Sequence, residues 1–423
     1  MANNLSSNVT RKLARVFLEG FDEARVITKS INSQLLSNRF DPSSGSTVDF
    51  KRPHDYKTIR TTDGDLTGGA VKSDIIAGKA TGTVQPYFTE ATEWSNLEQA
   101  IELDQLDEIL KPMARRMVTD LEVDIAKFMT LNSGLSVGTP GNAVAAWTDV
   151  AAAGALMENI GVPTDQQWCY AMNPNTQVAL ANKQTELNSG DPLVKDAWTK
   201  AMISSDFAGM RVMKSTALHS LTASTGAAKA GALASAPDLT YVTAKDTMTQ
   251  VLALKSMTNG LAIKAGEIIE ITGRFRLSNA TRLPIVDAAG NQVKFRGTVV
   301  ADSTLSGTGT GNVTITGPAI FEANGGYNTV DSALATNDVV TIISPTATFL
   351  QPNMFWHPQA FGIGTVKLPK LYSTDTVATT KDGFSIRISK YADGDKNKQM
   401  VRYDMLPAFA VFNPSFAGQG YGA

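Results

Sequence analysis

The hydrophobic pattern predicts a long amphipathic helix at the start of the chain, over residues 7–36. Apolar positions recur at helical spacing while charged residues fill the other face; these apolar positions are Val9, Leu13, Val16, Phe17, Phe21, Ala24, Ile27, Ile31 and Leu35. Gly20 weakens the centre of this helix by up to ~1 kcal/mol. The helix has no core of its own, so its apolar face must dock on the chain or on a neighbour. Burial in a membrane surface is an alternative, which the mixed charge of the polar face disfavours.

The next stretch, residues 46–90, has an extended and mostly polar pattern. A Pro/Ser/Gly-rich break over 41–46 precedes it, Asp63-Gly64 is a turn signal, and Gly68-Gly69 follows. The region contains little apolar material, and an isolated hairpin is marginal in water. We therefore expect a long loop that is either flexible or lies on another subunit.

A second helix is expected from a capping box at Ser95–Glu98 onward. One apolar stripe follows at helical spacing, made of Leu106, Leu110, Met113, Met117, Leu121, Ile125 and Phe128. Pro112 is expected to kink or split this helix, which should end near residues 132–134. The stripe is typical of a core helix packed on a sheet.

Residues 135–215 mix helical and extended patterns, as in an α/β or α+β domain. An Ala-rich helix is predicted over 150–160, a strand over 167–172, a helix from Thr176 and another extended piece from Val212.

Residues 216–345 change character and become rich in Thr, Gly, Ala and Val. Short apolar runs over 267–271, 293–300, 312–316 and 338–343 are separated by turn residues, notably at 288–291 and 307–311. This spacing predicts a small all-β barrel or sandwich of about six strands. Residues 346–423 return to a mixed pattern, with Phe384, Ile386 and Ile388 alternating as a strand. The β module is therefore interpreted as an insertion.

Composition limits the classes of protein that fit. Charged residues make up 18% of the 423 residues, below the ~25% typical of soluble domains. This fits a chain that hides much of its surface against copies of itself, and also a Thr/Ser/Gly-rich β domain. The net charge of −2 argues against a dominant nucleic-acid binder. Cys169 is the one cysteine, so no internal disulfide is possible. No secretory signal is visible, and no apolar run approaches the ~20 residues of a membrane span.

The sequence predicts no catalytic site, no cofactor and no metal. The histidines His54, His219 and His357 lack partners at metal-ligand spacing, and no G-x-S-x-G motif accompanies them. Gly78-Lys79 fails as a phosphate loop because Ala80 replaces the Ser or Thr.

Two further stretches resemble ligand sites and are interpreted structurally. The glycines at 307–311 join two predicted strands, unlike a dinucleotide-binding loop. The acidic run over 90–108 lacks the pattern of a calcium loop and is interpreted as a solvated helix face.

The order of these parts resembles the Hong Kong 97-type capsid fold, an α+β fold with N-arm, E-loop, P-domain with spine helix, and A-domain. The β module resembles the domain inserted in coat proteins of short-tailed phages of the P-twenty-two type. The local stretches that carry the resemblance lie at 115–128, 173–174, 265–269, 353–361 and 402–406. The resemblance implies an N-terminal helical arm at 1–45, an E-loop at 46–90, a P-domain with spine helix at 91–134, an A-domain at 135–215, an inserted β-barrel at 216–345, and a return to P-domain and A-domain at 346–423.

The resemblance implies a major capsid protein without enzymatic activity. Such subunits form pentamers and hexamers of an icosahedral shell around double-stranded DNA. They assemble in the host bacterial cytoplasm with a scaffolding protein and a portal protein, and the shell then matures by expansion. Contact with packaged DNA is expected to be non-specific, and no membrane is involved. Three alternatives remain at this stage: a minor virion structural protein, a β-rich surface-binding or adhesin protein, and a hydrolase that uses one of the histidines.

Charged residues of the arm and the loop are the candidate inter-subunit or scaffold contacts. They are Arg11, Lys12, Arg15, Glu19, Asp22, Glu23, Asp49, Lys51, Arg52, Lys57, Asp63 and Asp65. Scaffold docking is expected on acidic residues of the arm. In this sequence basic residues precede those acids.

Overall fold

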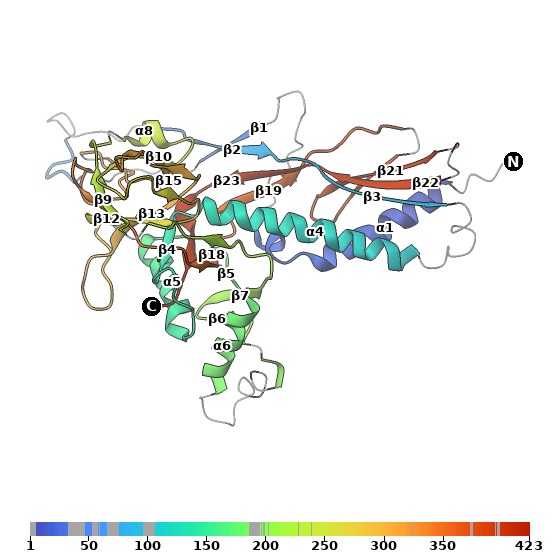
Figure 1. Cartoon of the computed structure of the whole chain (residues 1–423), viewed down its shortest axis with the longest axis horizontal. Helices are drawn as coiled ribbons and strands as arrows, with labels where there is room; N and C mark the ends of the chain where they lie inside the picture. The colour runs from blue at the N-terminus through green and yellow to red at the C-terminus, as the bar shows by residue number, and fades with distance from the viewer. Residues whose placement is uncertain are drawn as a thin grey trace. The chain divides into compact units, whose positions relative to one another are not determined.

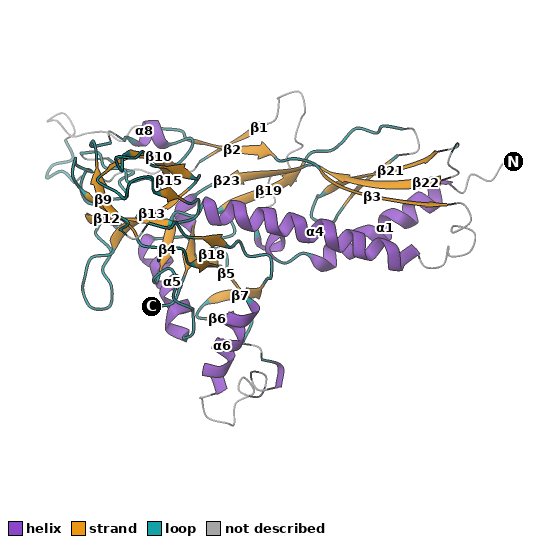
Figure 2. Cartoon of the chain, in the orientation of Figure 1, coloured by secondary structure: helices purple, strands orange, loops and turns teal. Residues whose placement is uncertain are grey.

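The computed structural model describes residues 6–32, 47–52, 58, 60–65, 76–95, 106–185 and 195–423, the last range with gaps at 196, 198, 202, 227, 238, 324, 373, 374, 394, 396 and 397. The fold is mixed α+β with several separate sheets (Figure 2). The chain divides into two compact units, which are residues 1–49, 81–126 and 361–411, and residues 50–80, 127–360 and 412–423. The division into six parts stays a prediction.

The first unit is built from long strands and two helices (Figure 1). Its elements, some of which run on into the second unit, are α1 Ser6–Ala24, the 3-10 helix η1 Ile27–Ser30, β1 Thr47–Lys51, β2 Lys79–Val84, β3 Phe88–Ser95, α4 Leu106–Leu131, β19 Phe361–Thr365, β20 Thr376–Thr379, β21 Ser385–Asp393, β22 Lys398–Met405 and β23 Pro407–Val411. They form two four-stranded sheets, with strand orders β1-β2-β23-β19 and β20-β21-β22-β3.

Helix α1 buries its apolar face within its own unit. Phe17 stacks on Tyr403 of β22 with ring centroids 4.0 Å apart, and Phe21 lies 5.7 Å from Phe384. Gly20 is buried against α4, where an added Cβ would lie 3.4 Å from the Cβ of Ala114. The glycine that weakens the helix thus allows the two helices to approach closely. This burial does not favour the membrane-surface alternative.

The predicted extent of the first helix, 7–36, was too long. The α-helix ends at Ala24 and a short 3-10 helix follows; residues 33–36 lie outside the described part. The apolar spacing continues past Ala24, but the backbone N–H groups of Val26, Ile27 and Thr28 donate to the carboxylate of Glu122 on α4. A tertiary contact therefore ends the helix where the periodicity does not.

Helix α4 carries the predicted core stripe as one unbroken helix. Leu110, Met117, Leu121 and Ile125 are fully buried. Pro112 lies inside the helix without splitting it; a proline removes one backbone hydrogen bond, and the buried stripe stabilises the remaining turns. Residues 96–105, which contain most of the predicted capping box, lie outside the described residues, and Ser95 is the last residue of β3.

The predicted turn at Asp63-Gly64 is confirmed. Gly64 has φ +80°, a conformation that glycine adopts without steric cost. The Asp63 carboxylate accepts the N–H of Asp65 at 3.0 Å, and the Thr61 hydroxyl accepts the N–H of Gly64 at 2.9 Å.

The second unit combines a six-stranded sheet with a barrel. Its remaining elements are β4 Leu135–Val137, α5 Trp147–Ile160, β5 Cys169–Met172, α6 Pro174–Thr185, β6 Asp206–Phe207, β7 Met210–Lys214, β8 Leu221–Thr222, β9 Ala230–Leu233, α8 Tyr241–Ala244, β10 Thr249–Lys255, β11 Ala262–Ile263, β12 Ile268–Phe275, β13 Lys294–Val299, β14 Ser303–Thr304, β15 Gly311–Thr316, β16 Val339–Ile342, β17 Phe349–Leu350, β18 Asn353–Trp356, η4 Pro414–Phe416 and β24 Ala417–Gly420. The sheet has the order β4-β24-β18-β5-β7-β6, so strands from the C-terminal part lie at its centre. Cys169 is buried in β5 and forms no disulfide.

The barrel is closed by strands in the order β10-β15-β13-β12-β16-β9. Its interior is a single apolar cluster that includes Leu252, Ile269, Phe295, Val313 and Val340. The predicted turns at 288–291 and 307–311 are confirmed, with positive φ at Gly290 and Gly309. Two-residue strands β8 and β17 pair where the chain enters and leaves this region.

Candidate interaction surfaces and buried polar sites

Glu122 is a buried carboxylate that organises the corner after α1. It is 4% exposed, although it stands beside the apolar stripe of α4. It accepts three backbone N–H groups from residues 26–28 at 2.7–3.1 Å, and the Thr28 hydroxyl at 2.6 Å. Four donors on one carboxylate offset the cost of burying its charge.

Arg25 adds a second polar contact at the same corner. Its side chain is 2% exposed, and it pairs with Asp22 at 3.2 Å and with Asp382 at 2.7 Å. The guanidinium also lies 4.3 Å above the ring of Phe384, a favourable cation–π position. Asp22, one of the candidate contact residues, is therefore engaged inside its own subunit.

Asp404 is the centre of a charge network in the β20-β21-β22-β3 sheet. It is fully buried and accepts hydrogen bonds from Arg387 at 2.6 Å, from Arg402 at 2.7 Å and from Thr89 at 2.7 Å. Burial alone would raise the pKa of Asp404, but the hydrogen bonds from Arg387, Thr89 and Arg402 outweigh it and lower that pKa. The carboxylate is thus charged at neutral pH.

A buried ion pair lies where the chain enters and leaves the barrel. Lys229 and Glu267 are 3.2 Å apart with almost no exposed side chain. The Lys229 ammonium also donates to the carbonyls of Ser344 and Pro345, while Glu267 accepts from Ser224 and from the N–H of Lys264. These bonds fix both ends of the barrel segment to each other.

Arg52 is buried, although the sequence suggested it as a contact residue at the surface. It is 7% exposed and donates to the carbonyls of Lys79, Asp246 and Phe412. Burial lowers the pKa of Arg52 to about 10, partly opposed by Tyr241 and Asp246. The guanidinium thus holds three backbone segments of the second unit together.

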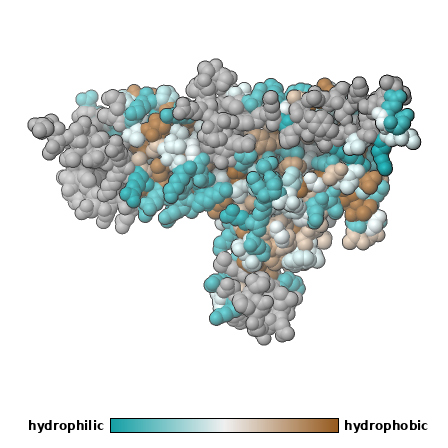
Figure 3. Space-filling view, turned by 180° about the vertical axis from the view of Figure 1, so that it is seen from behind, coloured by the Kyte–Doolittle hydropathy of each residue, from teal (hydrophilic) through white to brown (hydrophobic). Residues whose placement is uncertain are grey.

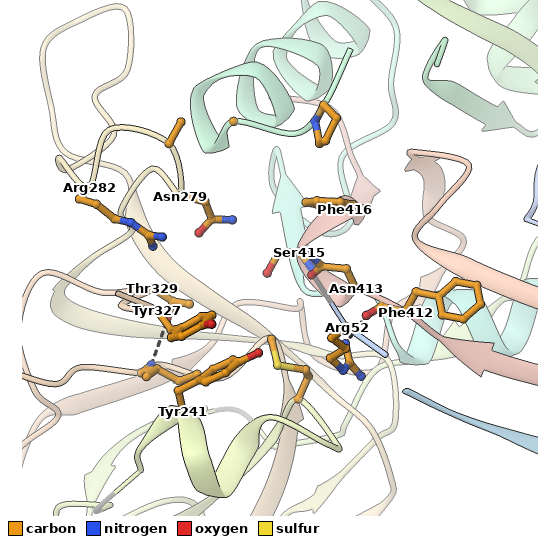
Figure 4. Close-up of a pocket in the computed structure, with 15 residues that line it drawn as sticks. Arg52, Tyr241, Asn279, Arg282, Tyr327, Thr329, Phe412, Asn413, Ser415 and Phe416 are labelled. Atoms are coloured by element: carbon orange, nitrogen blue, oxygen red, sulfur yellow. Dashed lines mark hydrogen bonds between the residues drawn. The ribbon is translucent and has the colours of Figure 1, made fainter. Parts of the chain in front are cut away.

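Arg52 also borders a cavity of about 280 Å³ (Figure 4). Tyr241 of α8 stacks on Tyr327 there, with ring centroids 3.6 Å apart, and Phe416, Asn279 and Arg282 line other sides. This volume is slightly below the ~300–1,000 Å³ of typical small-molecule sites.

A larger hollow of about 960 Å³ lies beside the barrel. Its lining includes the outer face of α5, β4 and the hairpin over residues 285–294. A charged cluster borders it, where Glu270 pairs with Lys294 at 2.8 Å and with Arg296 at 3.1 Å.

The histidines form no catalytic constellation among the described residues. His357 is fully buried; its Nδ1 accepts the N–H of Gln359 at 3.1 Å, so its Nε2–H donates to Asp165 at 3.0 Å. Burial lowers the pKa of His357, and the hydrogen bond to Asp165 opposes that shift. Both ring nitrogens are occupied, so this imidazole is not free to activate a nucleophile. Burial likewise lowers the pKa of His219, and His54 lies outside the described residues.

Within the described part of the chain, no cluster of His, Cys, Asp and Glu side chains could hold a metal ion. No described helix combines the length and the apolar character needed to cross a membrane.

The twelve candidate contact residues lie in different environments. Arg15, Glu19, Glu23, Asp49, Asp63 and Asp65 are exposed. Asp49 accepts the hydroxyl of Thr81 at 2.6 Å, and Asp22 and Arg52 are engaged as described above. The side chains of Arg11, Lys12 and Lys51, and the whole of Lys57, lie outside the described part.

Large apolar side chains are exposed at separate points of the described surface. They include Phe349 at 68%, Leu283 at 65%, Leu371 at 58%, Tyr87 and Trp147 at 55%, and Tyr372 at 53%. On the face drawn in Figure 3, hydrophobic residues form small patches among hydrophilic ones. Apolar residues exposed singly are normal on a protein surface, so among the described residues only Leu371 and Tyr372, which are adjacent in sequence, form a candidate contact patch.

Sequence reasoning missed the buried acids Glu122, Glu267 and Asp404. Glu122 carries the one usable signal, an acid directly beside the apolar stripe of α4. The other two lack such a signal, because the buried cations that pair with them, Lys229 for Glu267 and Arg387 for Asp404, are 38 and 17 residues away along the chain.

Two comparisons match this chain to phage coat proteins over almost its whole length. The family model described as "P22 coat protein - gene protein 5" matches residues 1–422. The chain is 39% identical over 427 residues to the "Major capsid protein" of Acyrthosiphon pisum secondary endosymbiont phage 1, with 100% of both chains covered.

Similar solved structures include a chain from Mycobacterium phage Che8, with 11% identity, a TM-score of 0.46, and 93% of this chain and 90% of that chain covered. Another is the capsid structure of the cyanophage P-SCSP1u, with 11% identity, a TM-score of 0.42, and coverage of 90% and 84%.

The family model and the 39% identical relative define the class as a structural coat protein of a phage, not an enzyme. The chain belongs to the P22 coat protein family, and as a major capsid protein it forms the shell of the virion. The adhesin, hydrolase and minor-protein alternatives are not favoured.

Proposed function

We propose that this chain assembles as pentamers and hexamers into an icosahedral shell that encloses double-stranded DNA. The full-length match to the coat-protein family carries the proposal. Closed symmetry uses up all complementary patches and so stops growth at a defined size. Many weak contacts for each subunit add up by multivalency.

The parts of the subunit follow the Hong Kong 97-type plan. Residues 1–45 act as the N-arm, 46–90 as the E-loop, 91–134 as the P-domain with the spine helix α4, 135–215 as the A-domain, and 216–345 as an inserted barrel domain. Residues 346–423 return to the P-domain and the A-domain and complete them. Within the family, we place the chain among coats of short-tailed phages, nearest to that of the Shigella phage called Sf-six.

Assembly runs through a precursor shell that needs a scaffolding protein and a portal protein, takes place in the bacterial cytoplasm, and ends in expansion. The exposed acids Glu19 and Glu23 on α1 support scaffold docking at the arm, and the exposed Asp63 and Asp65 support contact with a neighbouring subunit. Contact with packaged DNA is non-specific, since the net charge is −2.

The barrel stabilises the subunit and links neighbouring capsomers. Its closed strand order and apolar interior support the first role, since a barrel without free edges holds its own structure. Deletion of residues 220–345 tests both roles. Normal folding and normal shells of the shortened chain would contradict them.

Electron microscopy of the purified chain, expressed with and without its scaffolding partner, tests the assembly. Closed shells of uniform size with the partner are expected. A small monodisperse species in both preparations, together with the absence of the chain from phage particles, would overturn the proposal.

A further inference from the structure

The loop after β19 exposes two adjacent large apolar side chains. Leu371 is 58% exposed and Tyr372 is 53% exposed. They are the only neighbours in sequence among the exposed large apolar residues that the structure describes. Single exposed apolar residues are normal on a protein surface, whereas adjacent ones form a patch suited to a partner.

A buried carboxylate fixes the backbone beneath this pair. Asp375 is 1% exposed and accepts the N–H of Leu371 at 2.7 Å and the N–H of Tyr372 at 2.9 Å. The N–H of Asp375 donates in turn to the carbonyl of Tyr372 at 3.1 Å. These bonds tie the backbone of Leu371 and Tyr372 to a buried side chain.

A second buried charge holds the other side of the loop. Arg387, 6% exposed, donates to the carbonyl of Pro369 at 3.0 Å while it pairs with Asp404. Leu368, 4% exposed, anchors the loop in the core. A backbone held at Pro369, Leu371 and Tyr372 loses little entropy when the segment binds, which favours affinity.

The polar groups around the pair indicate what the partner carries. Lys367 and Lys370 are exposed, and no acid lies between residues 366 and 372. The patch is therefore positive around its apolar centre and complements an acidic surface.

We propose that residues 367–372, the Lys367–Tyr372 knob, form an inter-subunit contact that docks on an acidic face of a second copy of this chain. The proposal rests on the proposed assembly into a shell, where each subunit is surrounded by copies. The apolar pair supplies the buried centre of the contact and the lysines supply its rim, the usual division in protein interfaces.

The same chain offers two exposed acidic pairs that suit the lysines. Glu19 and Glu23 lie four residues apart on α1, and Asp63 and Asp65 flank the turn at Gly64. Either pair, on a neighbouring subunit, matches two positive charges and an apolar centre.

The first test compares shell formation by the full-length chain and by the double variant Leu371→Ser, Tyr372→Ser, with the scaffolding partner present. Loss of a contact centre raises the chain concentration needed for shells about 30-fold. Thermal unfolding of the free subunit changes little, since both side chains are more than half exposed and Tyr372 makes one tilted ring contact, with Tyr391 at 6.2 Å between centroids. If the double variant forms shells at the same concentration as the natural chain, the proposed contact at the knob is wrong and the proposed assembly stands. If the natural chain forms no shells, the proposed assembly itself is contradicted.

A second measurement needs no variant and so does not depend on folding of the mutants. Lys367 and Lys370 are expected to lose reactivity toward an amine-acetylating reagent when free subunits become shells. Equal labelling of both lysines in the two states overturns the proposal.

Charge reversal identifies the partner face. Lys367→Glu with Lys370→Glu is expected to block shells, and one of two compensating pairs, Glu19→Lys with Glu23→Lys or Asp63→Lys with Asp65→Lys, is expected to restore them. Because Glu19 and Glu23 are also the proposed scaffold contacts, binding of the scaffolding protein to the Glu19→Lys, Glu23→Lys chain is measured alongside. Lys381→Glu with Lys390→Glu is the control for net charge. Assembly by the 367/370 variant equal to that of the control contradicts the docking, and so does failure of both rescues.

Discussion

The barrel and the β20-β21-β22-β3 sheet are stabilised in different ways. The barrel closes on itself around apolar side chains and keeps its buried ion pair, Lys229–Glu267, where the chain enters and leaves. The sheet is open, with β20 and β3 at its edges, and it carries the buried charges of Arg387 and Asp404 in its middle.

The barrel therefore needs no partner to complete its hydrogen bonding, whereas the open sheet has free edges and loops that can contact other subunits. A closed barrel has no free strand edge to offer. An open sheet with charges that fix its loops is suited to hold contact surfaces in place. The four changes below test this contrast, from the largest expected effect to the smallest.

Asp404→Ala is expected to destabilise the open sheet by about 3–5 kcal/mol, because it leaves the Arg387 guanidinium buried without its carboxylate. Hydrogen exchange should accelerate in β21, β22 and β3 and stay unchanged in the barrel. Asp120→Ala is the control, since its pair with Arg116 is exposed and costs at most about 1 kcal/mol. Faster exchange in the barrel as well would remove the contrast between the two regions.

Leu252→Ala should destabilise the barrel by about 3 kcal/mol through the cavity that it leaves. The amides of β10 and β15 should exchange faster while those of β21 and β22 keep their protection. Val251→Ala, at a neighbouring position that is 54% exposed, should change little. A loss confined to the sheet would contradict the independence of the barrel.

Glu122→Gln should weaken the corner after α1 by about 1–3 kcal/mol, because an amide replaces a charged acceptor of four hydrogen bonds. Amide exchange at residues 26–28 is the measurement, and Glu19→Gln on the exposed face of α1 is the control. Unchanged protection at those three amides would show that the carboxylate does not hold the corner.

Mild acid should have the smallest effect, through His357. Burial lowers its folded pKa below the ordinary value of 6.5, so the unfolded chain binds the proton first as pH falls. Stability from this group is therefore complete above about pH 6.5 and decreases below it. Thermal unfolding between pH 7 and 5 should depend less on pH in His357→Gln than in the natural chain. Asp404 and Glu270 titrate below this window because their pKa values are lowered. An unchanged pH dependence in His357→Gln would assign the acid response to other groups.

Much of the fold was predictable where one local pattern decides the structure. The stripe of α4, the helix α5, the strand β21 with Ile386 and Ile388, and the turn at Gly64 all follow from spacing or from a special residue; Phe384 lies just before β21. The end of α1 was not predictable, because a carboxylate 95 residues away takes the N–H of Ile27. Arg52 was interpreted as a surface contact for the same reason, since its acceptors come from segments far along the chain.

The sequence alone determined which segments are helical or extended, that a Thr/Gly-rich β module stands in the middle of the chain, and, through its resemblance, the family. Those features depend on neighbours within a few residues, where periodicity and turn chemistry act. Only the tertiary structure decided which charges are buried, which strands close the barrel, and that Leu371 and Tyr372 face outward. Those outcomes depend on contacts between residues far apart in the chain, and the free energy of a buried charge is set by the partners that folding brings to it.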